Sequence, residues 1–144
     1  MYSGVKYDDK KNASENDIFG TIEIPKLNIY YPIFSNFNED LLKLAPCKFY
    51  GNNDISNNGN ICIAGHNYDN GKFFSNIALL NHNDIIYIYS NNKEKYTYLV
   101  TSNYEVSPND LTPILKYNND EKSLTLVTCN NLNGNRIIIK AIQK

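Results

Sequence analysis

The sequence predicts a mainly β protein in which seven or eight short strands form a closed or nearly closed barrel. Short segments of alternating or continuous apolar residues recur along the chain, and turn-forming residues, chiefly clusters of Asn, separate them. The chain has 144 residues, so it can bury a single core without disulfide bonds. It contains no internal repeat and no linker that would divide it. One folded domain is therefore expected.

The N-terminal segment differs from the rest of the chain. Residues 1–17 are polar and charged and show no apolar period, so we expect a flexible tail or tether there. The folded domain is expected to span residues 18–144.

Each predicted strand has its own pattern. Residues 20–24 alternate between apolar and polar side chains, and Pro25 then breaks the strand. Residues 84–90 and 95–106 are rich in Ile and Tyr, and the turn at Asn91 and Asn92 joins them into a hairpin. The remaining β-rich segments are residues 27–34, 60–64, 123–129 and 136–142.

Helical signals are few and short. Residues 38–44 carry a capping Asn, early acidic residues and apolar spacing, and Pro46 follows them. Residues 72–80 and 108–116 are also predicted to form short helices, and Pro113 falls in the first turn of the latter.

Composition argues against several classes of function. Lys and Arg number 14 against 15 Asp and Glu, so the net charge is −1 and no nucleic-acid partner is expected. No stretch approaches the roughly 18 consecutive apolar residues of a transmembrane helix. The 3 cysteines are an odd number, so at least one free thiol is expected.

The three cysteines lie in different contexts. Cys47 falls in a predicted loop and Cys62 in an apolar run, and both are interpreted as structural thiols. Cys129 ends a predicted strand and opens a polar loop, which places its sulfur at the rim of the barrel, partly exposed.

Two further groups suit chemistry at this rim. Arg136 opens the strand that follows the loop after Cys129, and a guanidinium favours a thiolate and stabilises an oxyanion. His66 also follows a predicted strand and is a candidate proton partner, whereas His82 is interpreted as a solvated turn residue.

Metal binding is the competing interpretation. Only Cys62 and His66 have a spacing typical of zinc ligands, and structural zinc takes four, so zinc is not expected. A calcium site formed by Glu105 with Asp120 and Glu121 stays open as an alternative. No metal or cofactor is assigned to the predicted rim site.

Four segments together resemble the sortase family, the cysteine transpeptidases of Gram-positive cell surfaces. Residues 125–129, Thr-Leu-Val-Thr-Cys, match the family's T-L-x-T-C signature. Residues 63–66 resemble the segment that carries the family's histidine, and residues 136–138 resemble the strand that carries its arginine. Residues 20–27 resemble the opening strand. The resemblance covers residues 18–142, with the four segments in the family's order.

This resemblance implies an eight-stranded sortase-type β-barrel with two or three short helices. It implies catalytic residues at one end of the barrel, namely Cys129, His66 and Arg136. It implies four substrate-binding residues by motif position, namely Ala64, Val127, Thr128 and Ile138. The segment 103–122 corresponds to the loop that shapes the groove for the first residues of the substrate.

The implied activity is transpeptidation. The substrate would be a surface protein with an LPxTG-like sorting signal, cleaved between Thr and Gly through a Cys129 thioester, and the acceptor an amine of a peptidoglycan precursor or a pilin. The resemblance also implies a monomeric ectodomain at the extracellular face of the membrane, with the expected anchor missing from this trimmed sequence.

Two alternatives stay open. The first is a cysteine hydrolase of the same peptides, which would use water in place of the amine. The second is a non-catalytic β-barrel binding module in which Cys129 is an inert thiol. The short chain favours a housekeeping-like or sporulation-associated sortase over the iron-acquisition and lidded pilus-polymerising types.

Overall fold

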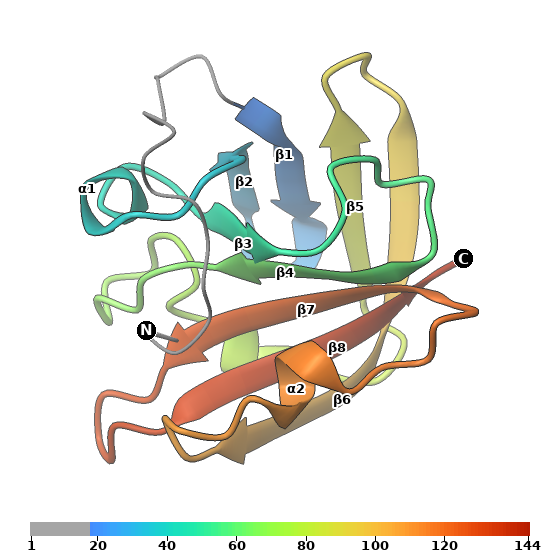
Figure 1. Ribbon diagram of the computed structural model, residues 1–144. Helices are drawn as coiled ribbons and strands as arrows, with labels where there is room; N and C mark the ends of the chain where they lie inside the picture. The colour runs from blue at the N-terminus through green and yellow to red at the C-terminus, as the bar shows by residue number, and fades with distance from the viewer. Residues whose placement is uncertain (1–17) are drawn as a thin grey trace.

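The computed structural model describes residues 18–144, and the predicted tail at residues 1–17 lies outside the described residues. Eight strands close into a barrel in the order β1-β2-β3-β4-β7-β8-β6-β5 (Figure 1). The predicted fold class is thereby confirmed. The strands are β1 (Ile18–Ile24), β2 (Ile29–Phe34), β3 (Cys47–Tyr50), β4 (Gly59–Ala64), β5 (Ile85–Ser90), β6 (Lys95–Val106), β7 (Lys122–Cys129) and β8 (Arg136–Gln143).

The helices are shorter than the sequence pattern predicts. Helix α1 (Glu39–Leu42) begins after Asn38, whose side chain accepts a hydrogen bond from the Leu41 amide as a helix cap. Helix α2 (Thr112–Leu115) is a single turn. The 3-10 helices are η1 (Pro25–Leu27) and η2 (Ile77–Leu79), the latter being all that forms of the helix predicted at 72–80. None of these described helices has the length and apolar character needed to span a membrane.

Strand β3 is absent from the sequence-based prediction, which places Cys47 in a loop; that placement is wrong. Cys47 is fully buried and begins β3, where it pairs with Phe34 of β2 and with Ala64 of β4. Four residues between Pro46 and Gly51 are too few to show a strand period. The strand closes the barrel between β2 and β4.

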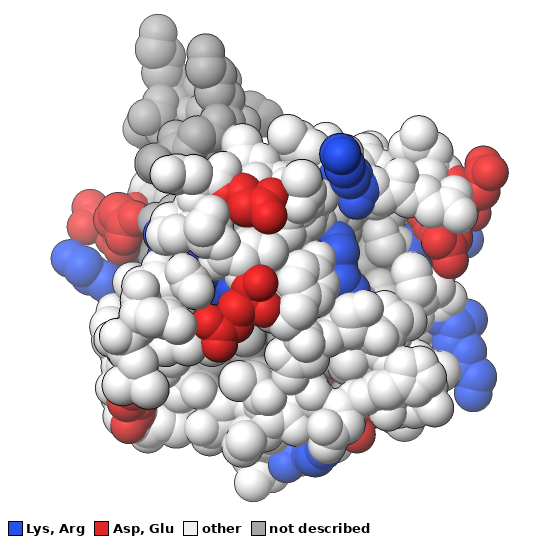
Figure 2. Space-filling view, turned by 90° about the horizontal axis from the view of Figure 1, so that it is seen from below, with Lys and Arg blue, Asp and Glu red and all other residues white. Residues whose placement is uncertain are grey.

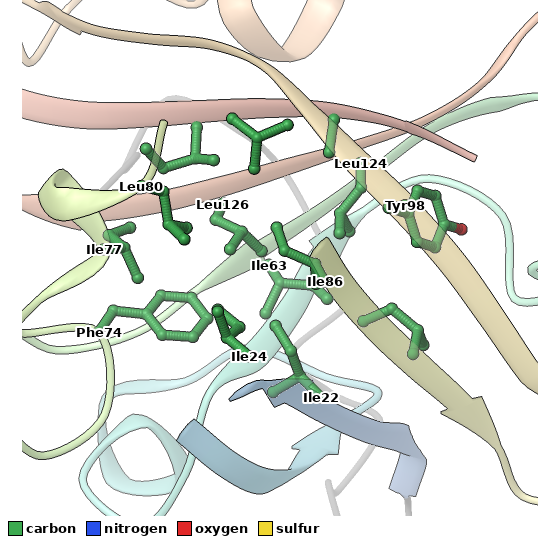
Figure 3. Packing of buried hydrophobic residues seen from close by; sticks show 14 of the residues in the cluster. Ile22, Ile24, Ile63, Phe74, Ile77, Leu80, Ile86, Tyr98, Leu124 and Leu126 are labelled. Atoms are coloured by element: carbon green, nitrogen blue, oxygen red, sulfur yellow. The ribbon is translucent and has the colours of Figure 1, made fainter. Parts of the chain in front are cut away.

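The barrel interior is filled by one apolar cluster. Ile and Leu side chains from opposite walls meet there, as Figure 3 shows for Ile22, Ile63 and Leu126. Phe74 and Ile77, from the segment between β4 and β5, close one end of this cluster. Burial of this apolar surface stabilises the closed barrel.

The outer face of β4, β7 and β8 carries a second apolar cluster. Along β7, the six residues from Ser123 to Thr128 are all buried, so both faces of this strand are covered. Leu41 and Leu42 of α1 and Ile114 of α2 belong to this outer cluster. A strand with one solvent-exposed face alternates between apolar and polar residues. Because β7 is buried on both faces, it lacks this alternation.

Charged side chains are scattered over the surface. On the face seen in Figure 2, acidic and basic groups lie in small separate clusters, and neither sign dominates. This distribution agrees with the formal net charge of −1.

A buried polar network anchors α2 to the outer face. The side-chain amide of Asn60, which is 1% exposed, donates hydrogen bonds to the carbonyls of Pro113 and Ile114, each at 3.1 Å. Its side-chain oxygen accepts a hydrogen bond of 2.8 Å from the Thr125 hydroxyl. Lys140 donates to the same Pro113 carbonyl and to the Thr125 hydroxyl. The backbone carbonyls of Pro113 and Ile114 lie in the connection between β6 and β7, where no neighbouring strand pairs with them. The network supplies the hydrogen-bond donors that these carbonyls need.

Replacing Asn60 by Ala should therefore destabilise the protein. The substitution removes both amide donors from α2 and leaves the Ile114 carbonyl and the Thr125 hydroxyl with fewer partners. We expect a loss of about 1–3 kcal/mol in the free energy of unfolding, measured by urea denaturation. Asn57→Ala, at an exposed position in the turn before β4, is the matched control and should change the free energy of unfolding by less than about 0.5 kcal/mol. Equal losses in both variants would contradict the anchoring role.

Candidate active site

The pairing of three neighbouring strands sets the geometry of the site. Strand β4 runs parallel to β7, with Ala64 opposite Val127, and β7 runs antiparallel to β8, with Val127 opposite Ile138. Two residues further along, Cys129 lies opposite Arg136. Side chains two residues apart on a strand share a face, so the Cys129–Arg136 pair continues the outer face that bears Val127.

His66 extends the same register beyond the end of β4. The Gly65 amide donates to the Val127 carbonyl at 3.1 Å, and the Thr128 hydroxyl donates to the Gly65 carbonyl at 2.7 Å. These bonds carry the pairing past Ala64 and bring His66 level with Cys129. Gly65 is required here because a Cβ atom at this position would lie 2.6 Å from the buried ring of Phe74. The three candidate catalytic residues therefore lie in one row.

Asn67 ties the His66 loop to the strand that bears Cys129. Its side-chain amide donates to the carbonyl of Cys129 itself at 2.8 Å. In the reverse direction, the Asn131 side chain donates to the Asn67 carbonyl and to the Asp69 carboxylate, each at 2.8 Å. Sequence reasoning did not single out Asn67 or Asn131, because Asn clusters are interpreted as turns throughout this chain.

Glu105, at the end of β6, holds the other side of the β7–β8 loop. Its carboxylate accepts hydrogen bonds from Asn130 at 2.9 Å and from Asn133 at 3.3 Å, and these bonds lower its pKa. The calcium alternative for Glu105 fails. Glu105 lies opposite Ile137, near the Cys129 end of β7, whereas Asp120 and Glu121 precede the other end. Among the described residues, no group of three metal-ligating side chains comes together.

The electrostatics distinguish the thiols and the imidazole. Burial raises the pKa of Cys47 and of Cys62 to about 12. Partial burial lowers the pKa of His66 below its ordinary value of 6.5, with Glu39 opposing this effect.

One guanidinium nitrogen of Arg136 donates to the Gly134 carbonyl at 2.9 Å. All three cysteines are free thiols, and only Cys129 is partly exposed. The other histidine, His82, lies exposed in a turn, as predicted.

The predicted substrate-binding residues lie directly behind this row. Ala64, Val127 and Ile138 face one another across β4, β7 and β8, and all three are fully buried in the outer cluster. Thr128 points to the other face of β7, is also fully buried, and binds the Gly65 carbonyl. Their contact with a substrate stays a prediction.

Comparison with known proteins gives a consistent result. A family model for the sortase domain matches residues 22–144. The chain is 35% identical over 127 residues to sortase A of Bacillus anthracis, an alignment that covers 86% of this chain and 59% of that protein. The chain spans about three fifths of the length of the curated relatives it matches.

Solved structures of sortases have the same fold. An X-ray structure of Clostridium perfringens sortase C, with the C-terminal cell wall sorting motif, superposes with a TM-score of 0.80. That match has 27% identity and covers 99% of this chain and 80% of that chain. The Clostridium perfringens sortase D5 transpeptidase superposes with a TM-score of 0.76 at 32% identity, covering 87% of this chain and 78% of that one.

The fold and the site define a closed β-barrel protein that carries a thiol, an imidazole and a guanidinium in one row at the ends of three neighbouring strands. With the domain match over most of its length, the chain belongs to the sortase family.

Thiol labelling should separate Cys129 from the other two cysteines. In the folded protein we expect a maleimide to modify Cys129 alone, because Cys47 and Cys62 are fully buried and their pKa values are raised to about 12. Peptide mapping by mass spectrometry measures the modified positions. Denatured protein is the control and should be labelled at all three cysteines. Equal labelling of the three in the folded protein would contradict this accessibility difference.

Proposed function

We propose that this protein is a cysteine transpeptidase that cleaves an LPxTG-like sorting signal between Thr and Gly and transfers the new acyl group to an amine. The observation that carries the proposal is the common register of His66, Cys129 and Arg136 on β4, β7 and β8. Membership of the sortase family and similarity to a sortase C structure with a sorting motif support the substrate class.

The first half of the reaction forms a thioester. The Cys129 thiolate attacks the Thr carbonyl carbon, and the guanidinium of Arg136 stabilises the negative charge that develops on the carbonyl oxygen. His66 as imidazolium donates its proton to the nitrogen of the leaving Gly as the peptide bond breaks. The products are a Cys129 acyl-enzyme, neutral His66 and the free amine of the C-terminal fragment.

The second half resolves the thioester. Neutral His66 takes a proton from the incoming amine as the amine nitrogen attacks the thioester carbonyl. The C–S bond then breaks, an amide forms, and Cys129 leaves as the thiolate. The cycle restores imidazolium His66 beside thiolate Cys129, so no external oxidant or cofactor is needed.

The apolar residues behind the row would contact the substrate residues that precede the scissile bond. Ala64, Val127 and Ile138 offer apolar contacts directly next to the Cys129 row, and the segment that contains α2 would border them. Because these side chains are buried in the described structure, a peptide reaches them only if the outer cluster opens. Thr128 would contribute indirectly, because its hydroxyl holds Gly65 and thus the His66 loop.

The partners follow from the reaction. The donor would be a surface protein with a sorting signal, and the acceptor an amine of a peptidoglycan precursor or a pilin. Such a reaction belongs at the extracellular face of the cell membrane, where a membrane-anchored, monomeric enzyme meets both substrates.

Intact-mass spectrometry tests the proposal directly. The protein is mixed with an LPxTG-type peptide in the presence and absence of triglycine. We expect an acyl adduct on the wild-type protein, its conversion to a peptide–triglycine product, and no adduct on Cys129→Ala. Cys47→Ala, which removes a fully buried thiol, should still form the adduct.

Each alternative predicts a different result in this experiment. A hydrolase would form the adduct but release only the hydrolysed peptide, even with triglycine present. A non-catalytic binding module would form no adduct with any sorting-type peptide. Either result would overturn the proposed transpeptidase.

The pH dependence of kcat/KM tests the roles of the two titrating groups. The reaction requires Cys129 ionised and His66 protonated, so the profile should be bell-shaped. Because burial lowers the pKa of His66, the acid limb should lie below pH 6.5, and less of the enzyme carries a protonated His66 at neutral pH than an ordinary histidine would give. Slow turnover is expected. A flat profile between about pH 5 and 9 would contradict this pairing.

A further inference from the structure

The imidazole of His66 lies against an aromatic ring. Its ring centroid is 4.7 Å from that of Tyr68, and the two ring planes differ by 23°, so the rings are stacked. Tyr68 is 46% exposed, which is high for a large aromatic side chain. Burial of apolar area therefore explains little of why a tyrosine occupies this position.

A second layer of rings supports Tyr68. The ring of Phe73 meets Tyr68 edge-on at a centroid distance of 5.9 Å and packs on Tyr31 of β2 at 5.1 Å. The Tyr31 hydroxyl accepts a hydrogen bond of 2.9 Å from the Phe73 amide. The column of Tyr31, Phe73 and Tyr68 thus connects the barrel wall to the imidazole.

The backbone of the loop is fixed in an uncommon conformation to make this contact. The Phe74 amide donates to the His66 carbonyl at 3.0 Å, which closes the loop 66–74. Within it, Asp69 and Phe73 adopt left-handed backbone angles, with φ of 57° and 53°. Such angles are unfavourable for a bulky residue like Phe and persist only where surrounding contacts hold them.

We propose that Tyr68 is a positioning residue that holds the His66 imidazole in one orientation beside Cys129 and favours its protonated state during catalysis. This inference rests on the proposed function of His66. A face-on aromatic ring restricts rotation of the imidazole, and its negative π face attracts the imidazolium. The stack would act against the desolvation that otherwise disfavours the charged ring.

The stack predicts signals that do not depend on substrate. Only two histidines are present, so the His66 ring protons can be assigned by NMR with His82→Asn as the reference variant. In the wild-type protein these protons should be shifted upfield by the Tyr68 ring. Tyr68→Leu keeps apolar cover but removes the π face, so it should abolish the upfield shift and lower the pKa of His66 by about half a unit.

The kinetic effect should fall on the chemical step. We expect Tyr68→Leu to lower kcat roughly two- to fivefold with KM unchanged, and to move the acid limb of the pH profile to lower pH. Tyr68→Phe keeps the ring and should retain both the NMR signals and kcat. The control is Tyr30→Leu, because Tyr30 is 66% exposed and points to the opposite face of β2 from Tyr31. Glu39 and Lys43, whose charges act on His66, stay unchanged in all of these variants.

The outcomes separate this inference from the proposed function. If the wild-type protein forms no acyl adduct, the proposed function fails, and the NMR signals still decide whether the rings stack. If Tyr68→Leu leaves the His66 signals and titration as in the wild type, the stacking fails. If the upfield shift disappears but kcat and its pH profile do not change, the positioning role is overturned.

Discussion

The parallel pairing of β4 with β7 is the constraint on which the site depends. It places Ala64 opposite Val127, and two hydrogen bonds at Gly65 extend the register by the two residues needed to reach His66 and Cys129. A shift of one residue would turn His66 to the opposite face from Cys129. Parallel neighbours also require a long connection, here residues 65–121, which contains β5, β6 and α2. The same connection therefore supplies both the wall of the barrel and the cover of its outer face.

Much of the fold follows from local pattern. The strands β5, β6 and β8 are rich in β-branched or aromatic residues, and their turns are marked by Asn, so their bounds differ from the predicted ones by one residue or less. Strand β3 escapes prediction because its four residues are stabilised by pairing with β2 and β4, contacts that local sequence does not contain. The overestimated helices have the same origin. Residues 72–80 have the apolar spacing of a helix because Phe74 and Ile77 fill one end of the barrel. These side chains are buried there although only a short 3-10 helix forms.

The site is predictable to the extent that it lies at strand ends. Cys129 and Arg136 flank one hairpin, so their proximity follows from antiparallel pairing alone. His66 is 63 positions before Cys129 in the chain, and the sequence links the two only through their places at strand ends and through the separate segments that resemble the sortase family. The supporting groups carry no such signal. Asn is common throughout this chain, so Asn67 and Asn131 cannot be distinguished from other Asn residues by sequence. The role of Tyr68 follows only from the contact of its ring with the imidazole of His66.

The outer face of β4, β7 and β8 changes along its length from buried hydrogen bonds, through apolar packing, to the partly exposed row of His66, Cys129 and Arg136. This change explains how reactive groups can lie on a stable barrel. At one end, Asn60 and Lys140 satisfy the backbone of α2 through buried hydrogen bonds. In the middle, apolar side chains pack against α1 and α2. The last row is partly exposed at Cys129, and it is held from its flanks by loop contacts rather than by burial. Groups that must change charge during catalysis gain from that arrangement, because full burial would fix them in their neutral states, as it does for the thiols of Cys47 and Cys62.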